Sequence, residues 1–176
     1  MRYLLGTAAA AALFAVATPA AAQTATVTST AEATARGTVL TSQSLTKTED
    51  LDFGVVTVDP TSLGGTVSVS ASAGSVQNVT GGVSALSALA KSARFDGLAA
   101  PGQSVSLTLN PPASGTLVGA VGAVDIVSME MDTTTGSKTA GSDGKFTVYV
   151  GGEFQIDPDQ AAGVYSNTFE LTAEYQ

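Results

Sequence analysis

The sequence predicts an all-β fold, an immunoglobulin-like antiparallel β-sandwich of about seven to nine strands. Short runs rich in Val, Thr and Ser alternate between apolar and polar residues. Gly, Pro, Asn and Asp divide these runs at fairly even spacing, as turn residues do between antiparallel strands. Helical patterning is weak even in its best segment, residues 83–91, because Gly81-Gly82 precedes it and Ser84 and Ser87 interrupt it.

Residues 1–22 have the features of an export signal. Arg2 supplies the charged start, residues 4–17 form an apolar stretch, and Ala20-Ala21-Ala22 forms a small-residue cleavage site. A membrane-spanning helix is the alternative, but it needs about 20 apolar residues, and Pro19 interrupts this one. We therefore expect an exported protein that begins at Gln23 and does not insert into the membrane.

The amino-acid composition excludes several classes of partner and of catalytic site. Without residues 1–22 the chain has 154 residues (176 − 22), six basic and fifteen acidic, a net charge of −9 (6 − 15) that makes nucleic acid and anionic lipid poor partners. Cysteine, histidine and tryptophan do not occur, which excludes most catalytic triads, thiol nucleophiles and zinc sites. The sequence predicts one domain that is not an enzyme, has no cofactor and is stabilised by packing and strand pairing.

The N-terminal part of the chain is predicted to contain an extended arm and two strands. Residues 23–37 are predicted to form an extended arm with threonines on one face and small apolar side chains on the other, and the sandwich is predicted to span residues 38–176. Its first strand is expected over residues 38–46, with a turn at 47–50 and a second strand over 55–58 that Asp59-Pro60 ends. The apolar face of the arm consists of Ala25, Val27, Ala31, Ala33 and Ala35.

The middle of the chain contains two half-buried strands and one ambiguous region. Residues 66–71 and 105–109 alternate cleanly, with Val67, Val69 and Ala71 inward in the first and Val105, Leu107 and Leu109 in the second. Residues 117–131 are apolar on both faces, so which face is inward stays open. The clearest internal strand, residues 145–156, directs Phe146, Val148, Val150, Phe154 and Ile156 inward, and a bulge or bend is expected at Gly151-Gly152.

In the last fourteen residues, 163–176, apolar and polar side chains alternate, which predicts a strand with one solvent-exposed face. Ser166, Thr168, Glu170, Thr172 and Glu174 lie on the polar side. Because no hairpin follows, we expect this strand to pair with residues far earlier in the chain or with another protein. Its apolar side consists of Tyr165, Phe169, Leu171, Ala173 and Tyr175.

Acidic residues offer two competing sites. Asp157 and Asp159, with Asp143 and Asp125, could supply oxygen ligands for calcium, but Asp-Pro-Asp is more simply a turn, so no metal site is expected. Pairs drawn from Glu130, Asp132, Glu153 and Glu170 could in principle hydrolyse glycosides, but no aromatic-rich cleft is evident and no catalytic residue is expected.

Five short motifs occur in order along the chain: Leu51-Asp52-Phe53-Gly54, Thr80-Gly81-Gly82-Val83, Ala100-Pro101-Gly102-Gln103, Tyr149-Val150-Gly151-Gly152, and residues 160–165, Gln-Ala-Ala-Gly-Val-Tyr. With these motifs the sequence resembles the bacterial domain of unknown function 4402 family. That family in turn resembles the subunits of chaperone–usher pili, including the archaic type similar to spore coat protein U. Such subunits end in an alternating strand with a glycine fourteen residues from the end and a penultimate aromatic residue, positions that Gly163 and Tyr175 occupy.

The resemblance implies a structural fibre subunit completed by donor-strand complementation. Gly163, Tyr165, Phe169, Leu171, Ala173 and Tyr175 would then belong to the acceptor groove, and Ala25, Val27, Ala31, Ala33 and Ala35 to the donor arm. The implied partners are identical or related subunits, a periplasmic chaperone and an outer-membrane usher. The implied location is the periplasm in transit and then the cell surface. Two alternatives stay open: the arm could be the domain's own first strand, and the protein could be a self-contained secreted adhesin or matrix protein.

Overall fold

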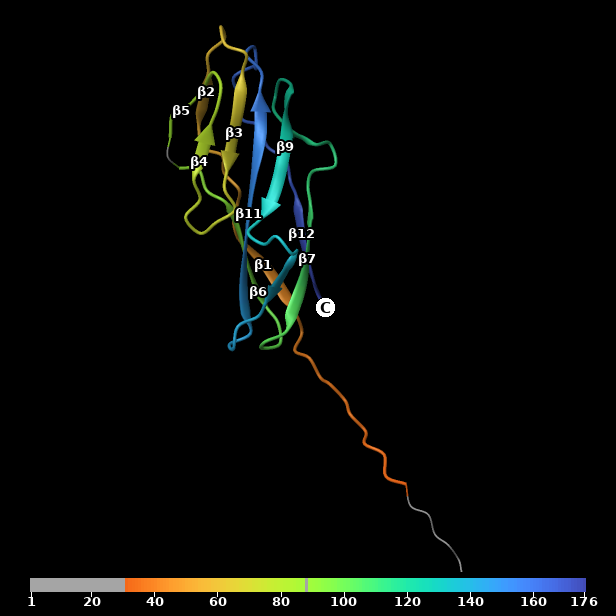
Figure 1. Cartoon of the computed structure of the whole chain (residues 1–176). Coiled ribbons are helices and arrows are strands. Elements are labelled where there is room, and N and C mark those ends of the chain that lie inside the picture. The colour runs from red at the N-terminus through yellow and green to blue at the C-terminus, as the bar shows by residue number, and fades with distance from the viewer. Residues whose placement is uncertain (1–30, 88) are drawn as a thin grey trace, which may run out of the picture. The chain divides into compact units, whose positions relative to one another are not determined.

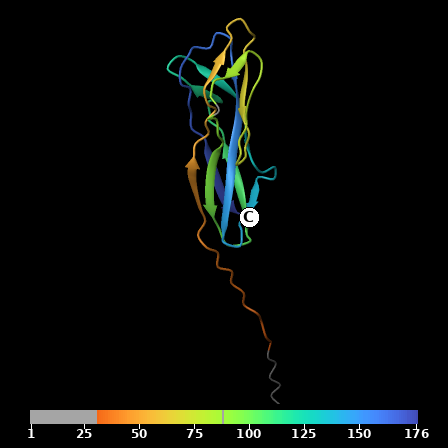
Figure 2. The same cartoon turned by 90° about the vertical axis from the view of Figure 1, so that its left-hand side faces the viewer.

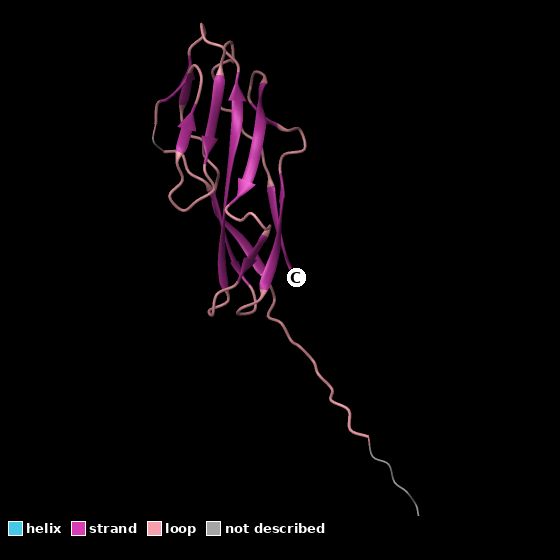
Figure 3. Ribbon diagram, in the orientation of Figure 1, coloured by secondary structure: helices cyan, strands magenta, loops and turns pink. Residues whose placement is uncertain are grey.

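The computed structural model describes residues 31–87 and 89–176, and this part of the chain contains strands and no helix (Figure 3). The predicted all-β fold is confirmed. The described residues form twelve strands rather than seven to nine, because strands also form at residues 77–79, 83–85, 93–98 and 137–139, where the sequence pattern predicts none. They are β1 (Ser44–Glu49), β2 (Val56–Val58), β3 (Gly65–Val69), β4 (Gln77–Val79), β5 (Val83–Ala85), β6 (Ala93–Leu98), β7 (Ser104–Asn110), β8 (Thr116–Val118), β9 (Ala123–Met131), β10 (Ser137–Thr139), β11 (Lys145–Ile156) and β12 (Glu170–Tyr175).

The compact unit spans Thr38–Gln176, and its larger sheet is organised around β11 (Figure 1). Val150 of β11 pairs with β6 on one edge and with β9 on the other, and Gly152 pairs with β3 and β9 in the same way. Therefore β6 and β3 lie end to end along one edge of β11, while β9 occupies the opposite edge. β1 extends the sheet beyond β6, β4 beyond β3, and β8 beyond β9.

The second sheet has the order β10-β7-β12, and β2 and β5 form a separate pair. The two larger sheets pack face to face, which can be followed in the view of Figure 2. Val105 and Leu107 from β7 are 0% and 5% exposed, and they meet Phe95 of β6 and Val148 of β11 in one apolar cluster. A second cluster, around Val67 and Phe154, fills the other half of the sandwich.

The inward face of β11 is the one that its alternation predicts. Phe146, Val148, Val150, Phe154 and Ile156 are all buried. A bulge or bend is expected at Gly151-Gly152. The register with β9 is unbroken there, so no bulge lies at this pair, but the opposite edge of β11 passes from β6 to β3 at Gly151, which pairs with neither. The glycines have a different role, because a Cβ on Gly151 would collide with the backbone of Val69 to Ala71, where β3 leaves the edge of β11.

The bulge lies in β9 and explains why its inward face was ambiguous. The register between β9 and β11 shifts between Glu153 and Phe154, so that Val127 is left without a partner. Val124 and Ile126 face inward before the shift, and Met129 and Met131 face inward after it. One extra residue therefore exchanges the two faces of the strand.

Two boundaries differ from the predictions. The first strand was expected over residues 38–46 but begins at Ser44, because the pairing with β6 covers Ser44–Glu49, and residues 47–49 are strand rather than turn. Residues 31–37 of the arm have no regular secondary structure. Ala25, Val27 and the expected export signal lie outside the described residues.

Candidate functional site

Within the described residues, the last strand, β12, is hydrogen-bonded along one edge only. It pairs with β7 from Glu170↔Asn110 to Tyr175↔Val105. The amide of Gln176 donates to the carbonyl of Ser104 (3.2 Å), so the even-numbered residues of β12 direct their backbone groups toward β7. The amides and carbonyls of Leu171, Ala173 and Tyr175 therefore point to the other edge, which pairs with no strand in the described part of the chain.

A second unpaired edge faces this one from the other sheet. β1 pairs with β6 and, among residues 31–87 and 89–176, with no other strand. Leu45 of β1 and Leu51, just beyond its end, pack on the same apolar cluster as Phe169 and Leu171. We call the strip between β1 with residues 51–53 on one side and residues 165–175 on the other the open seam.

Side chains along the open seam are only partly covered. On β7, the neighbour of β12, Val105 and Leu107 are buried, whereas the inward side chains of β12 in the same core layer are half-buried. The difference follows from position, because β7 has a strand on both sides and β12 has one. The half-buried apolar residues of the open seam are Leu45, Leu51, Phe53, Phe169, Leu171, Ala173 and Tyr175.

The two ends of the open seam differ. At one end the hydroxyl of Tyr175 accepts a hydrogen bond from the Ala100 amide (2.8 Å) and donates to the Thr41 carbonyl (2.7 Å), which bridges the two edges. At the other end the seam widens into a hollow of about 110 Å³. This hollow is lined by Leu51, Phe53, Pro112, Leu117, Ile126, Met129, Tyr165, Ser166, Asn167 and Phe169.

Aromatic side chains pack around the hollow at the wider end of the open seam. The ring of Phe169 packs edge to face on Phe95, with the centroids 6.1 Å apart, and Phe53 packs in the same way on Phe154 at 4.8 Å. The hydroxyl of Tyr165 is hydrogen-bonded to Gln160 and to the carbonyls of Val121 and Ala161. These packed and hydrogen-bonded side chains form the wall of the hollow, which suits an apolar side chain.

The structure brings five of the six predicted groove residues together. Tyr165, Phe169, Leu171, Ala173 and Tyr175 follow the open seam in order, whereas Gly163 lies in an exposed loop outside it. The strand begins at Glu170 rather than at Gly163 because Asn167 interrupts it, its side-chain amide donating to the Thr116 carbonyl (2.8 Å).

Sequence reasoning missed the opposite wall of the seam, Leu45, Leu51 and Phe53. Leu51 and Phe53 were noticed only as part of a family motif. The only local signal was two apolar residues in alternation after a charged stretch, which does not say which strand they will face.

The acidic residues considered for calcium or for hydrolysis are dispersed. Glu130, Glu153 and Glu170 lie on β9, β11 and β12, and Asp132 is bonded to Lys138 (2.9 Å) and to the Tyr149 amide (3.1 Å). Across the described residues, no group of three or more His, Cys, Asp or Glu side chains is placed to hold a metal ion. The same residues include no helix that could serve as a membrane span.

One charged pair lies on the outer face of the larger sheet. Arg94 and Asp96 form an ion pair (3.0 Å), and the Thr147 hydroxyl donates to Asp96 (2.7 Å). The hydrogen bond from Thr147, followed by that from Arg94, keeps the pKa of Asp96 below its usual value, and the bond to Asp96 raises the pKa of Arg94. These side chains alternate with buried Phe95, so they face away from the core and support the sheet.

Fold and site together define a β-sandwich whose last strand leaves one edge unpaired. A family model for "Domain of unknown function (DUF4402)" matches residues 43–175, from the start of β1 to the end of β12. The chain belongs to this family. No curated protein and no solved structure matches it.

Proposed function

We propose that this protein is a structural subunit of a bacterial surface fibre, assembled by donor-strand complementation. The observation that carries the proposal is the unpaired edge of β12 above a row of half-buried apolar side chains. An exposed edge of this kind invites another strand, because both its backbone groups and its side chains gain partners when one is added.

An added strand supplies both kinds of contact. Its backbone groups bond to the free amides and carbonyls of Leu171, Ala173 and Tyr175, and its alternate side chains cover the seam. Each half-buried side chain that becomes covered contributes on the order of 1 kcal/mol, against which stands the cost of ordering the incoming strand.

The donor in this proposal is the arm of a neighbouring subunit. Residues 23–37 span about 50 Å when extended, and the eleven seam residues 165–175 need about 35 Å, so the arm is long enough to fill the seam and continue into the next domain. The small side chains of Ala25, Val27, Ala31, Ala33 and Ala35 suit a seam that leucine and aromatic side chains already half fill.

Assembly then requires protection of the seam before the neighbour arrives. We assign this step to a periplasmic chaperone that lends a strand, and the exchange for the arm to an outer-membrane usher. The export signal expected in residues 1–22 fits this route to the cell surface. No catalytic residue or cofactor has a part in it.

Deletion of Gln23–Ala35 tests the proposal. The mature chain is expected to form filaments visible by electron microscopy, and the shortened chain is expected to form none. A matched pair of variants refines the test: Ala31→Asp with Ala33→Asp places charges on the apolar face of the arm, and Thr30→Asp with Thr34→Asp places them on the other face. We expect only the first pair to stop assembly. Filaments of normal length from the deleted chain would remove the donor role.

A second function, a self-contained secreted adhesin or matrix protein, is favoured by one contact. The Tyr175 hydroxyl joins the two edges of the seam within a single chain. In that case the deleted chain and the mature chain would both be monodisperse monomers with the same melting temperature.

A further inference from the structure

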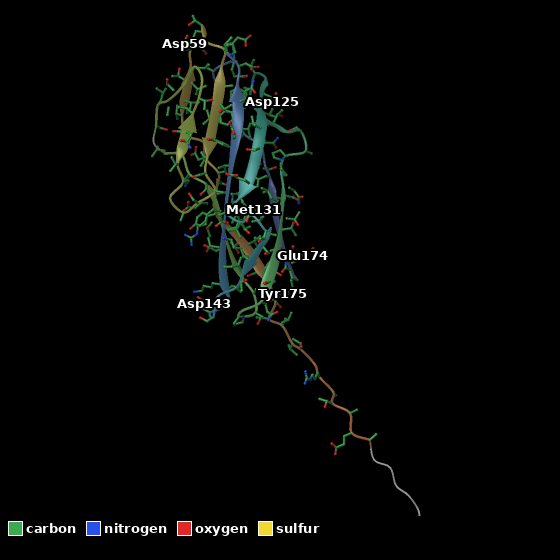
Figure 4. All side chains as sticks on the ribbon, in the orientation of Figure 1. Asp59, Asp125, Met131, Asp143, Glu174 and Tyr175 are labelled. Atoms are coloured by element: carbon green, nitrogen blue, oxygen red, sulfur yellow. The ribbon has the colours of Figure 1, made fainter. Side chains whose placement is uncertain are left out.

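Three loops at one end of the sandwich expose apolar side chains. Leu63 in loop 59–64 is 100% exposed, Val164 in loop 157–164 is 85% exposed, and Val121 in loop 119–122 is 68% exposed. The loops are neighbours, since Gly64 lies against Ile156 and Asp157, and Tyr165 bonds the Val121 carbonyl. We call this surface the distal face; Asp59 marks it in Figure 4, with Tyr175 and Asp143 at the opposite end.

The loops of the distal face are held by hydrogen bonds. The Asp59 carboxylate accepts hydrogen bonds from the hydroxyl (2.7 Å) and then the amide (2.8 Å) of Thr61, which keep the pKa of Asp59 below its usual value. The Gly82 amide donates to the Gly64 carbonyl (2.9 Å). Exposed apolar side chains that lie together on neighbouring loops mark a contact surface, whereas isolated ones do not.

The opposite end of the sandwich also exposes apolar side chains. Val39 is 96% exposed, and it precedes Thr41, which the Tyr175 hydroxyl bonds. Leu98, 48% exposed, ends β6 where that strand pairs with Ser44. We call Val39, Leu40 and Leu98 the basal face.

The direction of the donor strand determines which faces meet, and this step rests on the proposed function. β12 runs from the Tyr165 end of the seam toward the basal face. A donor antiparallel to β12, the pairing with the better hydrogen-bond geometry, therefore runs from the basal end to the distal end. The donor's own sandwich begins at Thr38, directly after its arm, so the basal face of that subunit comes to the distal face of the subunit it completes.

Charge complements the apolar contact. Arg36 is the penultimate residue of the arm and, like Lys91, has no ion pair within the described residues, whereas Lys47, Arg94, Lys138 and Lys145 are each paired. The distal loops contain no basic residue but carry exposed Asp59, Asp157 and Asp159. We propose that the distal face docks on the basal face of the next copy of this chain, with that copy's Arg36 beside Asp157 and Asp159.

Chemical cross-linking of assembled fibres tests this contact. The chain has no cysteine, so introduced thiols are unique. Val39→Cys with Val164→Cys, treated with a short bifunctional maleimide, is expected to give a ladder of covalent multimers after denaturation. Val39→Cys with Val127→Cys is the matched control, because Val127 is 54% exposed on β9, away from both faces, and it is expected to give no ladder.

Charge reversal supplies an independent measurement. Asp159→Arg or Arg36→Asp alone is expected to slow assembly about tenfold, and the two together are expected to restore the rate. Glu130→Arg, an exposed site on β9, is the control and should leave the rate unchanged.

The outcomes separate the two proposals. Normal fibres without a Val39–Val164 ladder would overturn the end-to-end contact and leave strand exchange intact. Dimers from Val39→Cys alone would indicate a donor parallel to β12 with two basal faces together, and would also overturn it. If the unaltered protein formed no fibres, the proposed function and this inference would fail together.

Discussion

Leu171→Ala should weaken binding of the arm as well as the fold. Truncation of a leucine in a closed core costs about 3 kcal/mol. Leu171 is only partly exposed in the isolated subunit, so most of that cost, ~2 kcal/mol, applies there. The remaining ~1 kcal/mol applies only when a strand covers the side chain, and it corresponds to a roughly fivefold weaker Kd.

The matched control for this prediction is Leu107→Ala, on the neighbouring strand β7. Leu107 is 5% exposed before any strand is added, so its truncation should cost about 3 kcal/mol of stability and leave the Kd within about twofold. Urea unfolding of the chain that starts at Thr38 measures stability, and fluorescence anisotropy of a labelled peptide of residues 23–37 measures binding. Equal Kd values for the two variants would refute the assignment of the seam as the strand-binding site.

Three further predictions concern the seam and its support. Tyr175→Phe removes the bridge between Thr41 and Ala100 and leaves the buried Ala100 amide without an acceptor. Urea unfolding should therefore show a free energy of unfolding lower by about 1–3 kcal/mol, with Tyr149→Phe as the control. An unchanged free energy of unfolding would mean that the bridge does not hold the seam. Gly151→Ala pushes a methyl group into the backbone of Val69 to Ala71 and should lower the free energy of unfolding by about 3 kcal/mol or more. Gly74→Ala, with open space around it, should change this free energy by less than about 0.5 kcal/mol. Similar values for both variants would contradict the close approach of β3 to β11. The pKa of Asp96 is lowered in the folded state, so its carboxylate contributes to the free energy of unfolding above the ordinary pKa of 3.8. This contribution is lost as the pH falls through the folded-state pKa. Below pH 3.8 the stability of Asp96→Asn should therefore fall less steeply than that of the unaltered protein.

Much of the open seam follows from contacts that local patterns do not encode. The side chains of β12 alternate, and a period of two suffices to predict that Phe169 and Leu171 share a face. What they face depends on chain segments more than a hundred residues earlier, and the bond from Tyr175 to Thr41 crosses 134 positions. No periodicity in either segment carries that information.

The sequence by itself determined the all-β class, the family, and the inward faces of β3, β7 and β11, because alternation with a period of two is a property of each strand alone. Tertiary structure decided the rest. It set the start of β1 by pairing with β6, moved the inward face of β9 by one residue at Val127, and placed Leu45, Leu51 and Phe53 opposite the last strand. These features depend on register and sheet order, which are set by the free energy of the whole sandwich rather than by any segment of it.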